Sequence, residues 1–420
     1  MIGYDDALLE LLKHARPLEA IPCAVTDALG KVLAVDMVSP MDLPSFDHSA
    51  MDGYALHAGV PLAAGSEHAV QGSQAAGDAS RTSAGAAWEI MTGARLPDGL
   101  DTVVPVERTE LLERRPDGSP ARIRLLEPLE LKANVRYAGS DVAKGAVVIS
   151  AGTRIEASHV MLLAALGMAQ VSVIRAPRVA IICTGKELQP DPTQPLGDGQ
   201  IYASNGPYLV AALASLGAQV HSCETVDDTR HTFVAAMHRA QEADVDLIVT
   251  TGAVSMGRYD FVPEALAELG ARVLFHKVAI RPGKPQLAAT LDDALVFALP
   301  GTPMAVAVGL RFFIVPVLRA MRGQQREPTW HASLDTPQQL KSGLRHFLRA
   351  TVTQDEAGRL HAQVLAQQQP FRMGPFARAG VWVVVPEGTA DMASGALVAV
   401  ASLHPDAPIF GGSHQPGVEP

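Results

Sequence analysis

The sequence predicts a multidomain α/β protein, and three observations lead to this fold class. Strands alternate with helices between residues 178 and 328, short β-type runs fill residues 45–139, and a second β-rich stretch begins near residue 330. A regular alternation of strands and helices is typical of a parallel sheet with helices on both faces. Because 420 residues exceed one ordinary core, we expect several domains.

The composition is that of a folded, acidic protein. Hydrophobic residues make up 48% of the chain and charged residues 19%, and the formal net charge of −10 opposes binding to nucleic acid through bulk charge. Cys23, Cys183 and Cys223 lack the spacing of a disulfide framework or a zinc site, so we interpret Cys183 as a small buried residue. The start is unlike a signal peptide, and the most apolar stretch, from His159, is too short to cross a bilayer. We therefore expect a cytoplasmic protein without membrane contact.

The N-terminal part begins with an amphipathic helix from Tyr4 to about Ala15, with leucines on one face. Residues 45–139 are rich in glycine, alanine, serine and proline and contain runs such as DTVVPVE, which indicates a β-rich insertion. After it the pattern predicts a strand, a helix capped by Ser158 that ends at Gly167, and another strand.

The clearest pattern begins at Arg178. It predicts strands in RVAIICTG, QVHSCETV, VDLIVTTG, RVLFHKVAI and ALVFALPG, and helices in SNGPYLVAALASLG, TRHTFVAAMHRAQEA, DFVPEALAELG and PMAVAVGLRFFIVPVLRAM. The last helix contains Pro316, where we expect it to bend or break. In such sheets the ligand lies beyond the carboxyl ends of the strands. At this edge of the sheet we expect the loops TGKEL, DDT, TTGAVSMGRYD and LPGTPMA.

Three cations lie in or directly after one of these strands. Lys277, Arg281 and Lys284 surround the rigid turn RPGKP, with no acid close by in a net-acidic protein, so we interpret them as an anion site. A solvated strand end is the alternative. The loop TTGAVSMG fits phosphate binding and ordinary turn packing equally well, and the chain has neither a Walker A motif nor GxGxxG there.

Carboxylates also gather at the predicted edge. Glu187, Asp227 and Asp260 each follow a strand, and Mg²⁺ prefers a few carboxylates together with waters and substrate phosphates. Capping of the following helices is the alternative role for these acids.

The stretch SFDHSAMDGYAL holds further acids, Asp47 and Asp52. Its local interpretation is an Asx-type turn in which Gly53 supplies an unusual backbone angle and His48 makes local hydrogen bonds.

The tail changes class again. HFLRATVTQDEAGRLHAQVL reads as a hairpin that turns between Asp355 and Gly358, and VWVVVPEGTADMASGALVAV reads as two more strands. We expect a small β-domain there.

The motifs FDHSAMDGYAL, IMTGARLPDG, IRPGKP and ALPGTPMAV follow one another in this order, together with CTGKEL and IYASN. In this the chain resembles the molybdopterin molybdenumtransferase family (MoeA and the gephyrin E-domain), from about residue 3 to residue 405. The resemblance implies four parts: an elongated N-terminal/linker part (1–44 and 140–177), a β-rich domain (45–139), a three-layer molybdopterin-binding α/β domain with a mostly parallel sheet (178–328), and a small C-terminal β-barrel (330–405).

The resemblance also implies an activity. Such an enzyme inserts molybdate into adenylylated molybdopterin and releases AMP with the help of Mg²⁺. It is a homodimer in which the β-rich domain of one subunit, with Asp52, faces the α/β domain of the other. Its implied partners are the molybdopterin adenylyltransferase and the molybdoenzymes or their chaperones. Catalytic roles are implied for Asp52, Thr92, Asp141, Glu187, Asp227 and Asp260, of which the last three are also the implied metal ligands. Substrate binding is implied for Gly252, Ser255, Gly257, Lys277, Arg281, Lys284, Pro300, Gly301 and Arg349.

The chain departs from the family pattern at several positions. His48 replaces the usual asparagine, Lys186 a frequent aspartate, Ala253 a common glycine and Thr302 the asparagine of LPGNP. The barrel segment QQQPFRMGPFARAG lacks the usual serines and has Pro370 near one of them. Two other functions stay open on sequence alone: an adenylyltransferase, whose fold the α/β domain resembles, and a non-catalytic molybdopterin-binding scaffold.

Overall fold

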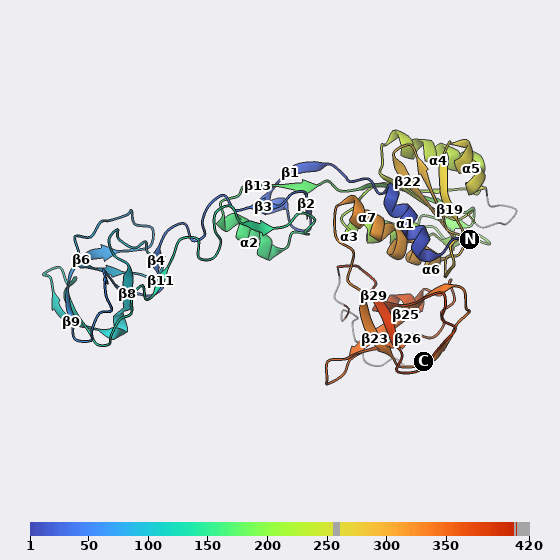
Figure 1. The fold of residues 1–420 in the computed structure, drawn as a ribbon. Coiled ribbons are helices and arrows are strands. Elements are labelled where there is room, and N and C mark those ends of the chain that lie inside the picture. The colour runs from blue at the N-terminus through green and yellow to red at the C-terminus, as the bar shows by residue number, and fades with distance from the viewer. Residues whose placement is uncertain (255–260, 407–408, 410–420) are drawn as a thin grey trace. The chain divides into compact units, whose positions relative to one another are not determined.

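The computed structural model describes residues 1–254, 261–406 and 409. The chain divides into two compact units, each of which is described by itself (Figure 1). The β-rich unit comprises residues 22–29 and 35–171, and the α/β-barrel unit comprises residues 1–21, 30–34 and those from 172 onward.

The β-rich unit is built on a six-stranded sheet in the order β8-β5-β7-β6-β10-β9. Its strands are β5 (Gly53–Leu56), β6 (Glu67–Gln74), β7 (Ala87–Ile90), β8 (Thr102–Pro105), β9 (Thr109–Arg114) and β10 (Pro120–Leu125). Successive residues of β5 point to opposite faces, so Tyr54 and Leu56 join one buried cluster while Ala55 joins another with Trp88 and Ile90. The predicted β-rich insertion is therefore a sheet with an apolar core on each face.

Shorter elements complete this unit. They are β3 (Met37–Val38), β4 (His48–Ser49), β11 (Val135–Arg136), β12 (Val147–Ile149), the 3₁₀ turns η1 (Val25–Asp27) and η2 (Val106–Arg108), and helix α2 (Ala157–Ala165). Helix α2 begins one residue before Ser158, and the Glu156 N–H donates to Nδ1 of His159 over 3.0 Å. The predicted Ser158 cap is thus wrong, because a glutamate and histidine pair closes this end. Gly167 follows the helix with a φ of 69°.

A small sheet combines β1 (Ala20–Ala24), β13 (Gln170–Ile174) and β2 (Val32–Leu33), in the order β1-β13-β2.

The α/β part of the other unit has a six-stranded sheet in the order β17-β14-β18-β22-β21-β19. Its strands are β14 (Arg178–Thr184), β17 (Gln219–Val226), β18 (Leu247–Thr251), β19 (Arg272–His276), β21 (Leu287–Leu291) and β22 (Ala294–Leu299). The first four strands of that order are mutually parallel, and β21 and β19 add an antiparallel edge.

Helices cover both faces of this sheet, as predicted (Figure 1). The helices are α1 (Tyr4–His14), α3 (Asn205–Ser215), α4 (Arg230–Glu242), α5 (Val262–Glu268), α6 (Pro303–Gly309) and α7 (Val315–Met321). Ile181 of β14 packs with α1, α3, α6 and α7, whereas its neighbours Ala180 and Ile182 pack with α4 and α5. Both faces of each central strand are buried, which explains why these strands read as continuous apolar runs.

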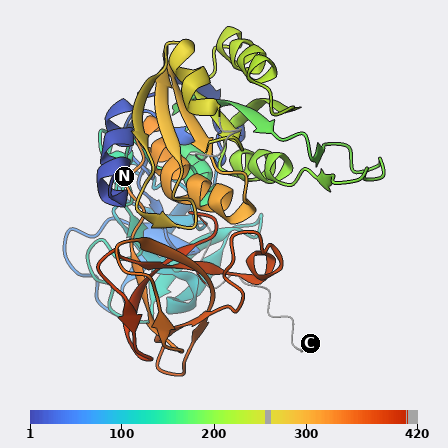
Figure 2. The ribbon, with the colours of Figure 1, turned by 90° about the vertical axis from the view of Figure 1, so that its right-hand side faces the viewer.

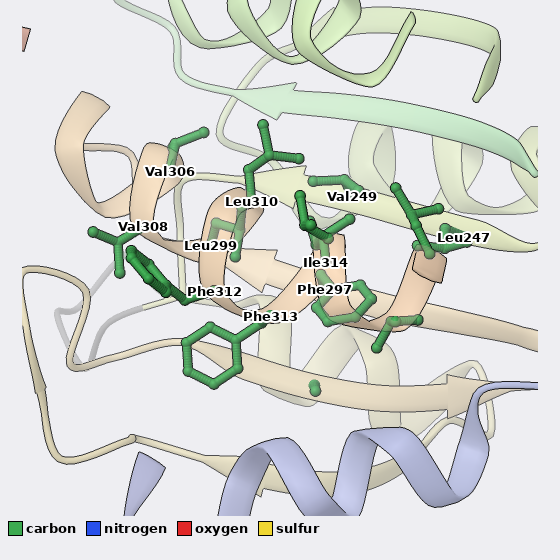
Figure 3. Close-up of a cluster of buried hydrophobic side chains, with 14 of the residues drawn as sticks. Leu247, Val249, Phe297, Leu299, Val306, Val308, Leu310, Phe312, Phe313 and Ile314 are labelled. Atoms are coloured by element: carbon green, nitrogen blue, oxygen red, sulfur yellow. The ribbon is translucent and has the colours of Figure 1, made fainter. Parts of the chain in front are cut away.

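The largest core lies between the sheet and the helices that contain α6 and α7. Figure 3 shows Leu247 and Val249 of β18 and Phe297 and Leu299 of β22 beside side chains of the last helix. The combined helix Pro303–Met321 is long and apolar enough to span a membrane, yet 83% of its apolar window is buried inside the protein. It is packed as the core helix of a folded domain.

The predicted break near Pro316 takes the form of a π-helical segment, η3 (Leu310–Ile314), between α6 and α7. In an α-helix the N–H of residue 316 would bond to the Phe312 carbonyl, and proline has no N–H. The Tyr4 hydroxyl of α1 donates to that carbonyl over 3.0 Å instead. A residue near the N-terminus therefore satisfies a buried acceptor of the central helix.

The C-terminal part is a closed five-stranded barrel, as expected. Its ring runs β25-β26-β23-β29-β27 and closes through the pairing of β27 with β25, and β20 (Ile280–Arg281) pairs with β25 from outside the ring. The ring strands are β23 (Trp330–Leu334), β25 (Arg345–Gln354), β26 (Leu360–Val364), β27 (Val381–Val385) and β29 (Leu397–Ser402). Short elements β24 (Gln338–Gln339), β28 (Asp391–Met392) and α8 (Gly374–Arg378) decorate it. Figure 2 shows the barrel below the α/β layers and the two-stranded ribbon β15 (Leu188–Gln189) and β16 (Ile201–Tyr202) extending away from the sheet.

Candidate functional site

Three loops meet at the carboxyl edge of the parallel strands. The Thr184 hydroxyl at the end of β14 donates to the carbonyl of Thr251 over 3.1 Å, and the Gly252 N–H after β18 donates to the carbonyl of Leu299 over 3.0 Å. The side-chain amide of Asn205, at the start of α3, donates to the carbonyl of Gly301 over 2.8 Å. These bonds fix the ends of β14, β18 and β22 against one another.

Gly252 is the position where this edge is tightest. Its φ is +96°, and a Cβ atom there would lie 2.5 Å from Oγ1 and 2.6 Å from the carbonyl oxygen of Thr184. Only glycine fits both the backbone angle and the close approach. The predicted turn glycine thus brings two strand ends together.

One pocket at this edge, called here the anion pocket, has a volume of about 490 Å³. Its lining includes the predicted residues Arg281, Lys284, Pro300 and Gly301, together with Pro370 of the barrel part. Among the residues that the structure describes, its lining contains two cations and no acidic side chain. Such a charge balance favours an anionic ligand.

Lys277, the third predicted cation, lies on the turn beside this pocket. Its N–H donates to the Gln286 carbonyl over 2.9 Å, its φ is 71°, and it is absent from the pocket lining. Lys277 therefore does not line the anion pocket with Arg281 and Lys284, although the N–H of its neighbour Val278 donates to the Lys284 carbonyl over 2.9 Å.

A second pocket, called here the carboxylate pocket, has a volume of about 410 Å³. Its lining includes Cys183, Thr184, Glu187 and Asn205, and it shares Gly301 with the anion pocket. The Glu187 carboxylate folds back over Gly185, where a Cβ atom would meet its oxygens at 2.7 and 2.8 Å. The two pockets thus place a carboxylate on one side of Gly301 and two cations on the other.

The other acids of this edge are placed differently. Asp227 is exposed after β17, and its backbone carbonyl accepts bonds from the Thr229 N–H (2.7 Å) and the Thr232 hydroxyl (3.0 Å). The predicted residues Ser255, Gly257 and Asp260 lie outside the described residues. Within the part of the chain that the structure describes, no three His, Cys, Asp or Glu side chains are grouped to hold a metal ion.

This donor set fits Mg²⁺ only as an ion shared with a substrate. Glu187 offers an exposed carboxylate beside a pocket, and Mg²⁺ is usually held by one or two carboxylates plus substrate phosphates rather than by an all-protein cage.

The β-rich unit brings Asp52 and Thr92 together. The Asp52 carboxylate accepts bonds from the Thr92 N–H (2.6 Å) and hydroxyl (2.9 Å), which hold the pKa of this exposed carboxyl below its usual value. Asp141 lies on a separate loop, where its N–H donates to the carbonyl of Leu43 over 3.0 Å.

The turn before β5 differs from the predicted one. Ser49, rather than an aspartate, makes the turn: its hydroxyl donates to the Met51 carbonyl over 2.5 Å. Gly53 is outside the left-handed region, but a Cβ atom there would lie 1.9 Å from the Val104 carbonyl oxygen. The reason for glycine is therefore the close approach of β8, and the predicted unusual backbone angle is wrong. The ring of His48 makes a local contact with the Phe46 carbonyl at 3.4 Å, in line with its predicted role.

Arg349, predicted to bind substrate, is fully buried in β25. Its guanidinium donates to the carbonyls of Gln367, Gln369 and Arg372 and to the side chain of Gln368. The Pro370 carbonyl in this segment accepts the N–H of Met304 in α6 over 3.0 Å. Arg349 thus holds the barrel segment that contains Pro370. Pro370 lines the anion pocket, whereas Arg349 does not.

Sequence reasoning missed Asn205 and Tyr202 as lining residues of the carboxylate pocket. Both belong to the motif IYASN that precedes α3, which was the available signal. Cys183 was expected as a small buried residue at a strand end near the site, and it is buried there and lines the carboxylate pocket.

The fold and site define a class: an α/β protein that offers cations, glycine loops and a carboxylate at the carboxyl edge of a parallel sheet. Three family descriptions match consecutive parts of the chain: MoeA N-terminal region (domain I and II) at 2–167, probable molybdopterin binding domain at 180–320, and MoeA C-terminal region (domain IV) at 331–403.

The chain is 35% identical over 416 residues to the molybdopterin molybdenumtransferase of Synechococcus elongatus, covering 96% of this chain and all of that relative. It is 32% identical to the Bacillus subtilis protein of the same name, over 95% of this chain and 93% of that one. A crystal structure of the molybdopterin biosynthesis MoeA protein from Pyrococcus horikosii matches with a TM-score of 0.80 at 27% identity, over 96% of this chain and 99% of that one. The chain belongs to the MoeA family of molybdopterin molybdenumtransferases.

Proposed function

We propose that this protein is a molybdopterin molybdenumtransferase that acts in molybdenum cofactor biosynthesis. Its substrates are adenylylated molybdopterin and molybdate, and its products are the molybdenum cofactor and AMP. The observation that carries this proposal is the pair of pockets that meet at Gly301, with Arg281 and Lys284 on one side and Glu187 on the other.

The length of the family match favours this activity over an adenylyltransferase. The relatives named molybdopterin molybdenumtransferase match across the N-terminal region, the α/β domain and the C-terminal region alike. An adenylyltransferase resemblance would rest on the α/β domain alone. A scaffold that only binds molybdopterin could use the glycines and cations of the sheet edge, but the acids there, Glu187 among them, argue against it because binding of an anion does not need them.

The proposed reaction needs no nucleophilic side chain from the protein. A phosphoanhydride is broken and AMP leaves, so charge neutralisation around the departing phosphate is the main requirement. We assign this neutralisation and the binding of anionic groups to Arg281 and Lys284. Pro300 and Gly301 shape the wall between the pockets, and Gly252 keeps the strand ends close. Carboxylates at the edge accept or return protons as molybdate loses oxygen to the dithiolene.

We further propose that Mg²⁺ assists this reaction. Glu187 and Asp227, with Asp260 from outside the described residues, are the residues that would hold it together with substrate phosphates. When bound, the ion supplies charge stabilisation at the phosphate bridge. Roles for Thr92, Asp141, Ser255, Gly257, Lys277 and Arg349 remain part of the same proposal, with Arg349 acting through the segment that it holds.

We propose that the protein works as a cytoplasmic homodimer in four domains (1–44 with 140–177, 45–139, 178–328 and 330–405). Asp52 of one subunit then serves the α/β edge of the other. The molybdopterin adenylyltransferase would supply the substrate, and molybdoenzymes or their chaperones would accept the product. Mixed dimers of Asp52→Ala and Lys284→Ala test this arrangement: they should recover AMP release in one of the two sites, whereas inactivity of every mixed dimer would oppose a shared site.

The activity itself is tested with the Lys284→Ala variant. AMP release should fall strongly, because a cation of the anion pocket is removed, whereas the matched surface variant Lys341→Ala should release AMP like the wild type. Incubation with Mg-ATP and molybdopterin should give no adenylylated product. Formation of that product would favour the adenylyltransferase.

A further inference from the structure

Two cysteines that the proposed reaction does not use lie on neighbouring strands of the α/β sheet. In the parallel pairing of β14 with β17, Cys183 is opposite Thr225 and Cys223 is opposite Ile181. The two cysteines are therefore two positions apart in register, and side chains with this spacing point to the same face of a sheet. The amino-acid spacing, forty residues apart in the chain, gives no hint of this proximity.

Helix α3 confirms that the two sulfur atoms lie together. A Cβ atom built on Gly206, in its first turn, would be 3.0 Å from Sγ of Cys223 and 3.4 Å from Sγ of Cys183. Both thiols thus lie under the same glycine. Neighbouring Asn205 makes the bond to Gly301 that joins the two pockets.

The two thiols have different environments. Cys183 is buried and lines the carboxylate pocket, and Cys223 is exposed on β17, an edge strand of the sheet. A hydrogen bond from the Cys223 thiol, assisted by Thr251, lowers the pKa of Cys183 to about 7 against the opposing effect of burial. The same bond raises the pKa of Cys223. The thiolate is the reactive form of cysteine, and both a lowered pKa and a place on a pocket wall favour its reaction.

We propose that Cys183 and Cys223 form a reversible redox pair that peroxides convert into a disulfide. The Cys183 thiolate attacks a peroxide oxygen, the O–O bond breaks, and a sulfenic acid and hydroxide form. The Cys223 sulfur then attacks the sulfenic sulfur, an S–S bond forms, and water leaves. In total two thiols and one hydrogen peroxide give one disulfide and two waters, and a dithiol reductant reverses the change.

The sheet geometry explains why this disulfide would be labile. Cβ atoms of diagonal neighbours on one sheet face lie about 7 Å apart, whereas a relaxed disulfide needs about 4 Å. The end of β17 must therefore move toward β14, which an edge strand can do. That end precedes Asp227, and its Val226 carbonyl accepts the Gly185 N–H over 3.1 Å. Strained disulfides are easily reduced, which suits a regulatory modification rather than a structural one.

Mass mapping tests the proposal without any assay of activity. The intact protein is treated with hydrogen peroxide, its free thiols are alkylated, and it is digested with trypsin. We expect the peptides 179–186 and 187–230 joined with the loss of two hydrogens, and separate again after reduction. In Cys223→Ser, Cys183 should be trapped by dimedone as a sulfenic acid. Full alkylation of Cys183 and Cys223 after peroxide, or links only between different protein molecules, would overturn the proposal.

A second measurement rests on the proposed function. Oxidation should cause a loss of AMP release that a dithiol restores, because the strand end beside the carboxylate pocket moves. Cys223 does not line either pocket, so the Cys223→Ser variant should release AMP at the rate of the reduced wild type. With peroxide this variant can form the sulfenic acid of Cys183 but not the disulfide, so it should lack the loss of AMP release that the disulfide causes. If the disulfide forms while AMP is released at an unchanged rate, the redox pair stands and its control of the pocket is refuted.

Discussion

The side-chain amide of Asn205 donates a hydrogen bond to the carbonyl oxygen of Gly301 over 2.8 Å. Asn205 begins α3, and Gly301 follows β22 and lines both the anion pocket and the carboxylate pocket. One bond therefore fixes the wall that the two pockets share. Any ligand that extends from the cations to Glu187 must pass this wall, so its position sets the spacing between the two charged ends.

Gly252→Ala should destabilise the protein more than the same substitution at a glycine with open space around it. The matched control is Gly270→Ala, since Gly270 also has a positive φ (+82°) but open space where a Cβ atom would lie. We expect the control to lose about 1 kcal/mol of the free energy of unfolding from backbone strain alone. Gly252→Ala should lose about 1–3 kcal/mol more, because its Cβ meets Thr184. Urea unfolding of both variants measures the difference, and equal losses would show that the strand ends can separate at no cost.

Tyr4→Phe should remove the partner of the Phe312 carbonyl. A buried acceptor left without a donor costs about 1–3 kcal/mol, which chemical unfolding at pH 7 would measure. Tyr202→Phe is the control, because the Tyr202 hydroxyl is exposed. Unfolding midpoints that fall by the same amount in both variants would contradict a special role for Tyr4.

The same variant makes a pH prediction. Burial raises the pKa of Tyr4 from 10.0 to about 12. In that interval the unfolded chain releases the tyrosine proton while the folded chain keeps it, so the stabilising effect is complete below pH 10 and is lost as the pH rises toward 12. The stability difference between wild type and Tyr4→Phe should therefore shrink over this range. A constant difference would place the hydroxyl in a solvated environment.

The parts of the fold that could be predicted are those encoded by residues close together in the sequence. The alternation of β14, α3, β17, α4 and β18 was predicted because each element carries its own apolar period and its own turn residues. Strand β21 was missed because it follows the turn RPGKP directly and has no helix before it, so the antiparallel edge had no signal. Pro316 predicted a disturbance in the last helix, but only the packing of α1 shows which hydroxyl repairs it.

The candidate site was predicted in part for the same reason. Arg281 and Lys284 share a short motif, and they do line one pocket. Arg349 was expected beside them, yet its environment is set by carbonyls of residues 367–372, which no local pattern reveals. The proximity of Cys183 and Cys223 likewise arises from strand register, which single-chain periodicity does not encode.

Arg349→Met should destabilise the barrel part and weaken molybdate use together. The variant removes the buried guanidinium that donates to the carbonyls of Gln367, Gln369 and Arg372, which we expect to cost about 3 kcal/mol of the free energy of unfolding. The KM for molybdate should rise because Pro370 lines the anion pocket. Arg378→Gln, an exposed residue of α8, is the control for both measurements. A stable variant with a raised KM would instead indicate direct contact between Arg349 and the anion.

Thr92→Val should move the acid limb of the pH–rate profile to higher pH. Two hydrogen bonds from Thr92 lower the pKa of Asp52, and valine removes the one from the hydroxyl. The carboxyl then protonates at a higher pH, so activity that needs the ionised form is lost earlier as the pH falls. Thr109→Val, which removes another exposed threonine hydroxyl of the same unit, is the control. A profile that is unchanged in Thr92→Val would remove Asp52 from the ionisations that limit the rate.

The most direct test of the proposed activity is AMP release from adenylylated molybdopterin by the purified protein, measured with Mg²⁺ in the presence and absence of molybdate. The proposed function predicts release that depends on molybdate and is lost in Asp52→Ala. Tight binding of the substrate with no release of AMP under either condition would contradict it and would identify a binding protein built on the same fold.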